Sequence, residues 1–258
     1  MPNSKIFLSA AVLSVLLGVG SASAADLPAR TYTKAPMMAP IYNWTGFYIN
    51  AGGGYGMWDA NQDTRNLAGT VLSISQKSGG DGYFGTVGAG YDWQVSQSWV
   101  GGIFADGQFG SIRGSMQDQL NGIAGNVKDR TNWAAGVRVG YLVAPTVLSY
   151  VNGGYSGASF SSATLLNAGG VPIATTPSFH RDGWFIGGGV ENQLGFFGFG
   201  PGWFMKTEYR AAEYNRINLP ETSVATALPN GFATTFKPIV QTVSTQLVYR
   251  FNWSGVGH

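Results

Sequence analysis

Hydrophobic and polar residues alternate with a period of two along most of this chain, beginning at Trp44. Between 132 and 143, for example, Trp133, Val137 and Tyr141 share one parity, whereas Arg138 has the other. This period is typical of β-strands whose two faces meet different environments, and an amphipathic helix would repeat every 3.6 residues instead. We therefore predict eight strands, at about 44–58, 83–94, 99–111, 132–143, 147–160, 183–194, 203–212 and 239–251.

The fifth of these segments, 147–160, has the least regular pattern. Val151 and Tyr155 oppose Asn152, but Leu148 and Tyr150 fall on the polar side. The sequence leaves open which face of this strand is apolar.

The predicted connections alternate between long and short. They are long after the first, third, fifth and seventh strands (59–81, 112–131, 161–182 and 213–238) and short after the others (95–98, 144–146 and 195–202). Outer-membrane barrels have an even number of strands, short periplasmic turns and longer external loops. The pattern predicts an all-β, eight-stranded antiparallel up-and-down transmembrane barrel with both termini on the periplasmic side.

All eleven prolines lie outside the predicted strands. Proline cannot donate a hydrogen bond to a neighbouring strand, so a closed barrel should exclude it from its wall. We accordingly place Pro172, Pro177, Pro220, Pro229 and Pro238 in the long loops.

The eight tryptophans fall at or near the ends of the predicted strands, as expected for the aromatic belts at two bilayer interfaces. Six have the parity of the apolar face, and Trp44 and Trp58 do not. We predict a periplasmic belt and an outer belt, formed respectively by Trp44, Trp93, Trp99, Trp203 and Trp253 and by Trp58, Trp133 and Trp184.

The first 24 residues have the features of a cleaved signal peptide. Lys5 precedes an apolar run over 6–20, and Ala22-Ser23-Ala24 matches a small-residue cleavage site. After it, no stretch approaches the roughly 20 apolar residues of a spanning helix. We predict a signal peptide at 1–24, a Pro-rich periplasmic arm at 25–42, the barrel at 43–253 and a short periplasmic tail at 254–258.

Composition supports this assignment. Hydrophobic residues make up 44% of the chain and charged residues only 11%, and there is no cysteine. These values argue against disorder, and they exclude a disulfide framework and a thiolate zinc site. A soluble sandwich or lipocalin-like barrel would also alternate by two, but it needs more charge on its exterior than this chain has. A net charge of +2 is too small to indicate a basic surface that would bind nucleic acid.

Several short motifs resemble a family of small outer-membrane proteins of alphaproteobacteria, the major surface antigens of 25 and 31 kilodaltons and their rhizobial relatives. They are ADLP at 25–28, NWTGFYI at 43–49, GWFIGGGVE at 183–191, KTEY at 206–209 and YRF at 249–251. The resemblance implies an outer-membrane location in a Gram-negative bacterium and a barrel that lacks a peptidoglycan-binding domain. Residues 252–258 follow the closing strand, so three alternatives stay open for the terminal insertion signal: Phe251, Trp253 or neither.

Seven charged residues have the inward parity. An eight-stranded barrel has just enough interior for side chains to fill, and charges held there must be paired. Two interpretations stay open: a salt-bridged plug, or a narrow polar path for small ions. The predicted lumen cluster consists of Asp106, Arg138, Glu191, Lys206, Glu208, Arg210 and Arg250.

Motifs for catalysis, phosphate binding or metal binding are missing from the sequence, and we predict no enzyme activity, cofactor or metal. Ser178, His180 and Asp182 alternate along one segment, but proximity in sequence does not make a catalytic triad. We interpret them as solvated loop residues.

The remaining candidate chemistry lies in four basic residues near the outer ends of strands, where the phosphates of lipopolysaccharide would lie: Arg113, Lys128, Arg130 and Arg181. The expected partners are outer-membrane lipids, lipopolysaccharide and the barrel assembly machinery, without nucleic acid. The oligomeric state is open. We predict a structural barrel that supports the envelope and displays four surface loops; the alternatives are a channel of small conductance and, more remotely, a lipid-modifying enzyme.

Overall fold

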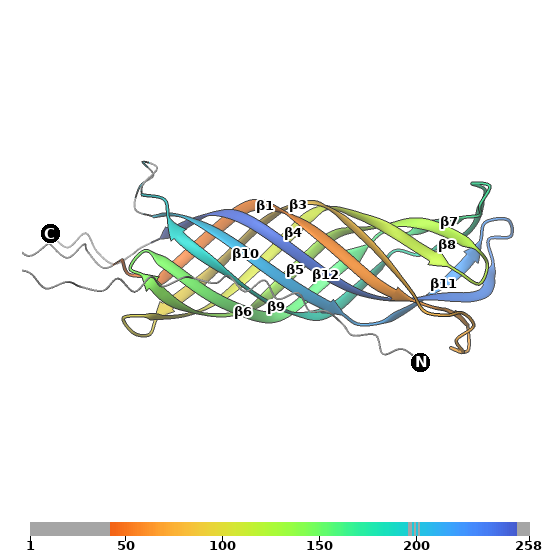
Figure 1. Ribbon diagram of the computed structural model, residues 1–258, viewed down its shortest axis with the longest axis horizontal. Helices are drawn as coiled ribbons and strands as arrows, with labels where there is room; N and C mark the ends of the chain where they lie inside the picture. Colours follow the sequence, from red (N-terminus) through yellow and green to blue (C-terminus); the bar gives the residue numbers. More distant parts are fainter. Residues whose placement is uncertain (1–41, 196–197, 199, 201, 252–258) are drawn as a thin grey trace, which may run out of the picture. The chain divides into compact units, whose positions relative to one another are not determined.

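The structure, a computed structural model, describes residues 42–195, 198, 200 and 202–251. Eight long antiparallel strands form a closed ring that runs obliquely around the barrel (Figure 1). The last strand pairs with the first, from Phe47↔Phe251 to Asn61↔Lys237, and this pairing closes the sheet. In ring order the strands are β1 (Gly46–Gln62), β3 (Gln76–Gln94), β4 (Trp99–Asp118), β5 (Ile123–Ala144), β6 (Val147–Phe160), β9 (Phe179–Gln193), β10 (Trp203–Tyr214) and β12 (Pro229–Phe251).

The predicted fold class, an eight-stranded up-and-down barrel, is therefore confirmed. The predicted signal peptide, nearly all of the Pro-rich arm, Trp253 and the tail at 254–258 lie outside the described residues. In the part of the chain that is described, no helix is long and apolar enough to span a bilayer.

The middle of the barrel has apolar side chains outside and polar ones inside. On β5, Val137, Val139 and Tyr141 are exposed on the outer face, whereas Arg138 is buried in the lumen. The face of β6 that the sequence left open is also determined: Leu148 is fully buried inside the barrel. The Leu148 side chain occupies the space in front of Gly140 on the neighbouring strand β5.

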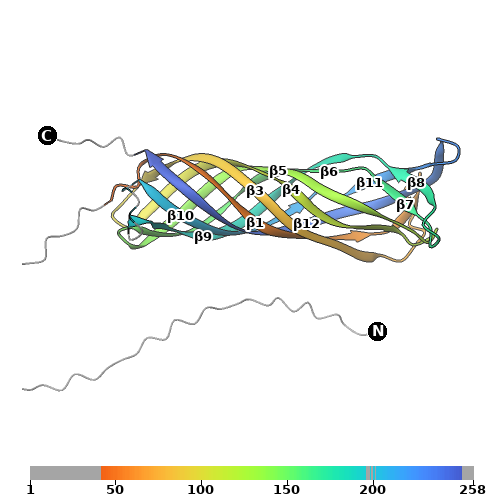
Figure 2. The same ribbon diagram turned by 90° about the horizontal axis from the view of Figure 1, so that it is seen from above.

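The predicted long loops are wrong in extent, because the chain remains in the sheet through most of them. β4 and β5 pair up to Asp118↔Ile123, well inside the segment expected to be a loop. Four short strands extend the barrel wall at the end away from Phe251, the last residue of β12 (Figure 2), and we call this region the outer extension. They are β2 (Thr64–Asn66), β7 (Ala163–Leu166), β8 (Pro172–Thr176) and β11 (Ile217–Ser223).

The strands extend beyond their predicted ends because the polarity of their two faces reverses there. In this extension Ile112, Met116 and Val127 are buried inside, whereas Arg113 is exposed outside. The outer face meets water there and carries small and charged residues, so the contrast that identified the membrane strands disappears from the sequence.

The prediction that proline stays out of the wall is wrong for four residues, Pro172, Pro220, Pro229 and Pro238. All four lie in the extension, where water can satisfy a backbone carbonyl that lacks a donor. The exclusion of proline therefore holds only where hydrocarbon surrounds the wall.

Two aromatic belts border the lipid-facing zone. Tyr91 and Trp93 lie 4.8 Å apart between ring centroids at the periplasmic end, and Trp133 and Tyr155 lie 5.8 Å apart at the outer end. Tyr141 and Trp133 are eight residues apart on β5, which at ~3.3 Å per residue and a tilt near ~40° is about 20 Å along the axis. An apolar band on an outer-membrane barrel is ~25 Å tall.

Of the predicted belt residues, Trp93, Trp99, Trp133 and Trp184 are exposed on the outer face, and Trp203 packs 5.0 Å from Tyr249. The prediction is wrong for Trp44 and Trp58. Both side chains are buried inside the barrel, as their inward parity requires, and so they belong to neither belt.

Candidate functional site

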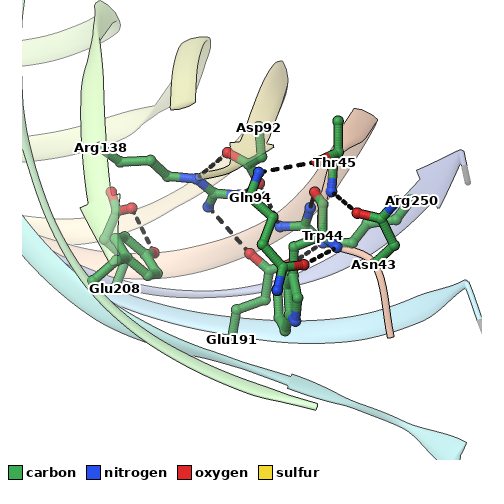
Figure 3. Close-up of polar contacts among 10 residues, drawn as sticks. Asn43, Trp44, Thr45, Asp92, Gln94, Arg138, Glu191, Glu208 and Arg250 are labelled. Carbon is green, nitrogen blue, oxygen red and sulfur yellow. Dashed lines mark hydrogen bonds and ion pairs between the residues drawn. The ribbon is translucent and has the colours of Figure 1, made fainter. Parts of the chain in front are cut away.

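Four charged side chains form a closed ring across the lumen near its periplasmic end, the charge ring of Asp92, Arg138, Glu191 and Arg250 (Figure 3). Arg138 donates to both carboxylate oxygens of Asp92 and, at 3.1 Å, to Glu191. Arg250 donates to Glu191 at 2.7 Å and lies 2.8 Å from Asp92. Each carboxylate thus meets two guanidinium groups, and all four residues are buried.

Aromatic rings enclose the charge ring. The guanidinium of Arg138 lies 4.4 Å from the ring centroid of Tyr48, and that of Arg250 lies 4.4 Å from Trp44. The Trp44 indole N–H donates to the carbonyl of Pro145 at 3.2 Å (Figure 3 shows Trp44 beside Arg250). Trp44 therefore closes the periplasmic mouth of the lumen rather than anchoring the wall in lipid.

A second cluster lies further along the lumen. Arg210 binds both carboxylate oxygens of Asp106, at 2.9 and 2.6 Å, and also binds Glu208 at 2.7 Å. Glu208 accepts further hydrogen bonds from Tyr150 and Asn152 at 2.8 and 2.9 Å. Lys206 is buried beside these groups, and no ion pair of Lys206 occurs in the described part of the chain. Together the two clusters hold four cations and four anions, so the lumen is electrically neutral.

Glycines on the inner face make room for these long side chains. A Cβ added to Gly102 would lie 2.0 Å from Asp92 Oδ1, and one added to Gly90 would lie 2.4 Å from Tyr48 Oη. At Gly88, the nearest atom would be the Asp106 Cβ at 2.8 Å. The glycines therefore accommodate the side chains of the charged layer.

An aromatic plug fills the outer extension. Phe160 and Phe179 stack 4.9 Å apart, and Phe236 meets both rings at 5.5 Å. Trp58 packs against Phe236 at 5.3 Å, and all four side chains are buried. Between this plug and the charged layer lies a cavity of about 10 Å³, which borders Asn132, Ser156 and Arg210 and has the minimum size for one water molecule.

The structure brings all seven predicted lumen residues together and adds Asp92, which the sequence analysis omitted. Asp92 has the inward parity of its strand, so the pattern contained the signal for it. Asp92 accepts hydrogen bonds from Arg138 near the periplasmic end of the lumen.

Asp129 is a buried carboxyl above the outer belt, and it forms no ion pair within the described part of the chain. Asp129 accepts a hydrogen bond from the Asn132 amide at 2.8 Å, and its other oxygen has no partner among the described residues. Burial raises the pKa of Asp129 to about 6, against a smaller lowering by the Asn132 hydrogen bond.

Three of the four predicted lipopolysaccharide contacts point outward. Arg113 and Lys128 are register partners on the outer face of β4 and β5, and Arg130 is exposed nearby. Asp81 on β3 is the register partner of Arg113 on its other side. The prediction that Arg181 contacts lipopolysaccharide is wrong. Arg181 shares the inward parity of Phe179 on β9, and its Nε is buried.

The predicted surface trio is also rearranged. His180 contacts Asp182 and Ser159, each at 3.1 Å, on the exposed outer face of β6 and β9. Ser159 is the register partner of His180, and Ser178 is not part of this network. The residues are cross-strand neighbours on a flat wall, an arrangement that any sheet surface provides.

The tips of the four outer hairpins carry no charge. Segments 66–76, 119–127, 162–179 and 222–236 contain no Asp, Glu, Lys or Arg. Ile74, Leu120, Val171 and Leu228 are exposed there. Within the described residues, no three His, Cys, Asp or Glu side chains are grouped so as to hold a metal ion.

A closed barrel with apolar residues facing outward between two aromatic belts, around a neutral polar lumen, defines the class: this is an outer-membrane β-barrel protein of a Gram-negative bacterium. The chain is homologous to the 31 kDa outer-membrane immunogenic protein of Brucella melitensis biotype 1. The two are 29% identical over 212 residues, which are 77% of this chain and 83% of the relative. The Brucella suis biovar 1 protein of the same name gives the same values.

Among solved structures, the outer membrane protein OprG of Pseudomonas aeruginosa superposes with a TM-score of 0.53 and 12% identity, over 81% of this chain and 98% of that one. This likeness concerns the fold alone. No family model matches the chain.

Loss of Arg138 should strongly destabilise the barrel, because it leaves Asp92 and Glu191 buried with one guanidinium between them. Breaking a buried ion pair typically costs about 3–5 kcal/mol. We expect Arg138→Ala to lower the temperature at which the purified protein converts from its compact to its unfolded form on SDS gels. Arg113→Ala, on the outer surface, is the matched control, and equal temperatures for the two variants would refute the structural role of the charge ring.

Asp129 should make stability depend on pH. Its folded pKa of about 6 exceeds the ordinary value of 3.8, so the folded state holds the proton more tightly and loses stability as pH rises from about 4 to above 6. We expect Asp129→Asn to stabilise the barrel at pH 8 by up to about 3 kcal/mol and to change it little at pH 4. Urea unfolding at both pH values measures this, with the outward-facing Asp59→Asn as control; a benefit independent of pH would contradict the assignment.

Proposed function

We propose that this protein is a closed structural barrel that stabilises the outer membrane and displays four hairpins on the cell surface. The observation that carries the proposal is the filled lumen. Trp44, the charge ring, the second charged cluster and the aromatic plug follow one another along the axis. The four cations and four anions of the two charged layers balance, so these layers are neutral without a bound ligand.

A channel of small conductance is the alternative, and the lumen gives it little support. An ion would have to separate the buried pairs of both clusters and then pass the packed rings of Trp58, Phe160 and Phe236. The cavity between the two regions holds at most one water molecule. A continuous aqueous path would therefore require rearrangement of two independent layers.

Planar-bilayer recording tests this choice. We expect the refolded protein to give no steady unitary currents, because both layers block the bore. Two variants change the lumen, Glu208→Ala and Arg210→Ala. Asp81→Ala on the outer wall is the control, because a current that arises outside the lumen would not distinguish it from the lumen variants. Steady currents of the wild type that change in the two lumen variants alone would establish the channel instead.

Binding of lipopolysaccharide phosphates is the second part of the proposal. Arg113 and Lys128 lie directly opposite each other on neighbouring strands, where like charges are destabilising unless an anion lies between them. Asp81 offsets one of the two charges, and Arg130 adds another cation. Lys128 lies five residues beyond Trp133, about 16 Å along the strand at ~3.3 Å per residue, so the group is outside the hydrocarbon zone.

We expect lipopolysaccharide to raise the unfolding temperature of the wild type and to raise it much less when Arg113, Lys128 and Arg130 are all changed to Ala. Arg181→Ala provides a matched control, since Arg181 has the inward parity and should retain the full effect. The measurement is thermal unfolding in detergent with and without added lipopolysaccharide. An equal loss in the Arg181 variant would point to net charge rather than to this group of cations.

We propose no catalytic role. His180 makes hydrogen bonds to Ser159 and Asp182 on the exposed outer wall, and none of the three residues lines a cavity described above. The relatives named above are called outer-membrane immunogenic proteins, a name that states a location and an immune response and no catalytic activity.

A further inference from the structure

The wall of the outer extension is interrupted at one place. β6 gives way to β7 at 161–162, β8 to β9 at 177–178, and β10 to β11 at 215–216. β9 and β10 are paired as far as Gly183↔Tyr214, and pairing resumes between β8 and β11 only at Thr175↔Thr222. In the described part of the chain, β11 therefore has no register partner on this side between Ile217 and Glu221.

Two prolines at the interruption make it a permanent feature. Pro177 and Pro220 border it from opposite sides, and neither has an N–H to donate. The two edges therefore cannot join into a regular ladder at these positions. Because the two prolines keep the strands unpaired here, the gap in the sheet persists and can serve as a binding site.

A cavity of about 490 Å³ opens at this position on the outer wall. Its volume is within the range of small-molecule sites, ~300–1,000 Å³. Thr164, Thr175 and Thr222 are register partners across β7, β8 and β11, so they form a row of hydroxyl groups across the sheet. The other lining residues are Ser162, Ala163, Thr176, Pro177 and Pro220.

The chemistry of this lining selects one class of ligand. The lining has no cationic side chain, so it offers no charge partner to a phosphate or a carboxylate. The hydroxyls of Ser162, Thr164, Thr175 and Thr222 make no hydrogen bond to another described residue. Thr176, in contrast, accepts from the backbone N–H of Ala163 at 3.3 Å and belongs to the floor. Four available hydroxyls beside two proline rings match a neutral molecule that has both hydroxyl groups and C–H faces.

We infer that this cavity is a binding site for a neutral saccharide of one or two sugar units. Its position agrees with that ligand. Pro177 lies seven residues beyond Trp184 of the outer belt, about 23 Å along the strand at ~3.3 Å per residue, so the cavity faces the saccharide layer outside the bilayer. The sugar comes either from lipopolysaccharide of the same membrane or from a free glycan outside the cell.

Saturation-transfer NMR on the refolded full-length protein tests the inference. The protein is held in dodecylphosphocholine, a detergent without sugar groups. The probes are neutral oligosaccharides prepared from the lipopolysaccharide core of the source bacterium, freed of acyl chains, phosphates and acidic sugars, and the neutral disaccharides maltose and sucrose. We expect at least one of these probes to bind.

The variant Thr175→Val/Thr222→Val removes two hydroxyls at nearly constant shape and should weaken binding about tenfold, the effect of losing two or three hydrogen bonds. Thr70→Val, in another hairpin, is the matched control and should bind like the wild type. Retention of the compact form on unheated SDS gels shows that each variant is folded. If the double variant is not, Ser162→Ala replaces it, with a loss of about threefold.

Binding of the core oligosaccharide alone assigns the site to the protein's own membrane, and binding of the disaccharides assigns it to free glycans. The inference is overturned if no saccharide binds to the wild type, or if the folded valine variant binds as tightly as the wild type. It is also overturned if a neutral extended peptide binds at this site and the saccharides do not.

Discussion

The bilayer interior has no water to accept or donate a hydrogen bond, and the rest of this structure depends on that constraint. Each unpaired backbone group would cost several kcal/mol in hydrocarbon, so the strands must satisfy one another completely. The long pairing of β1 with β12 removes the last free edges. Where water returns, the constraint is relaxed, and the wall then tolerates Pro220, Pro238 and an unpaired stretch of β11.

Closure with eight strands determines what the interior must do. The bore is too narrow for a wide aqueous channel and too wide to stay empty, so side chains fill it. Charges are acceptable there only in balanced groups, and the charge ring achieves this by giving Asp92 and Glu191 two guanidinium partners each. Tyr48 and Trp44 then cover the guanidinium faces, so the ring is neutral, hydrogen-bonded and shielded.

The sequence was sufficient for the membrane zone because two solvents act there on alternate residues. Val139 and Arg138 are neighbours in the chain, yet one faces lipid and the other the lumen, and this contrast identifies the strand, its lipid-facing side and the inward charges. Beyond the outer belt the contrast reverses: Ile112 lies inside and Arg113 outside. A prediction that assumes one polarity for the whole barrel therefore ends the strands too early. It also places Trp58 in an aromatic belt, although Trp58 is part of the aromatic plug.

Pairing partners in the lumen could not be derived in the same way. Parity places Arg138 and Arg210 inside, but it does not state that Arg138 binds Asp92 while Arg210 binds Asp106, because those choices depend on the tilt of strands far apart in sequence. The inner glycines reflect the same limit. Gly90 and Gly102 are explained only once Tyr48 and Asp92 are known to occupy the space in front of them.

The division between the two zones also determines where recognition can evolve. Within the membrane zone, almost every position is constrained from one side by lipid and from the other by a filled, neutral lumen. In the extension the outer face is free, the core is held by Phe160, Phe179 and Phe236, and breaks in pairing cost little because water satisfies them. An interrupted wall above a rigid aromatic plug is therefore the part of this barrel where a surface site can form without loss of stability in the membrane.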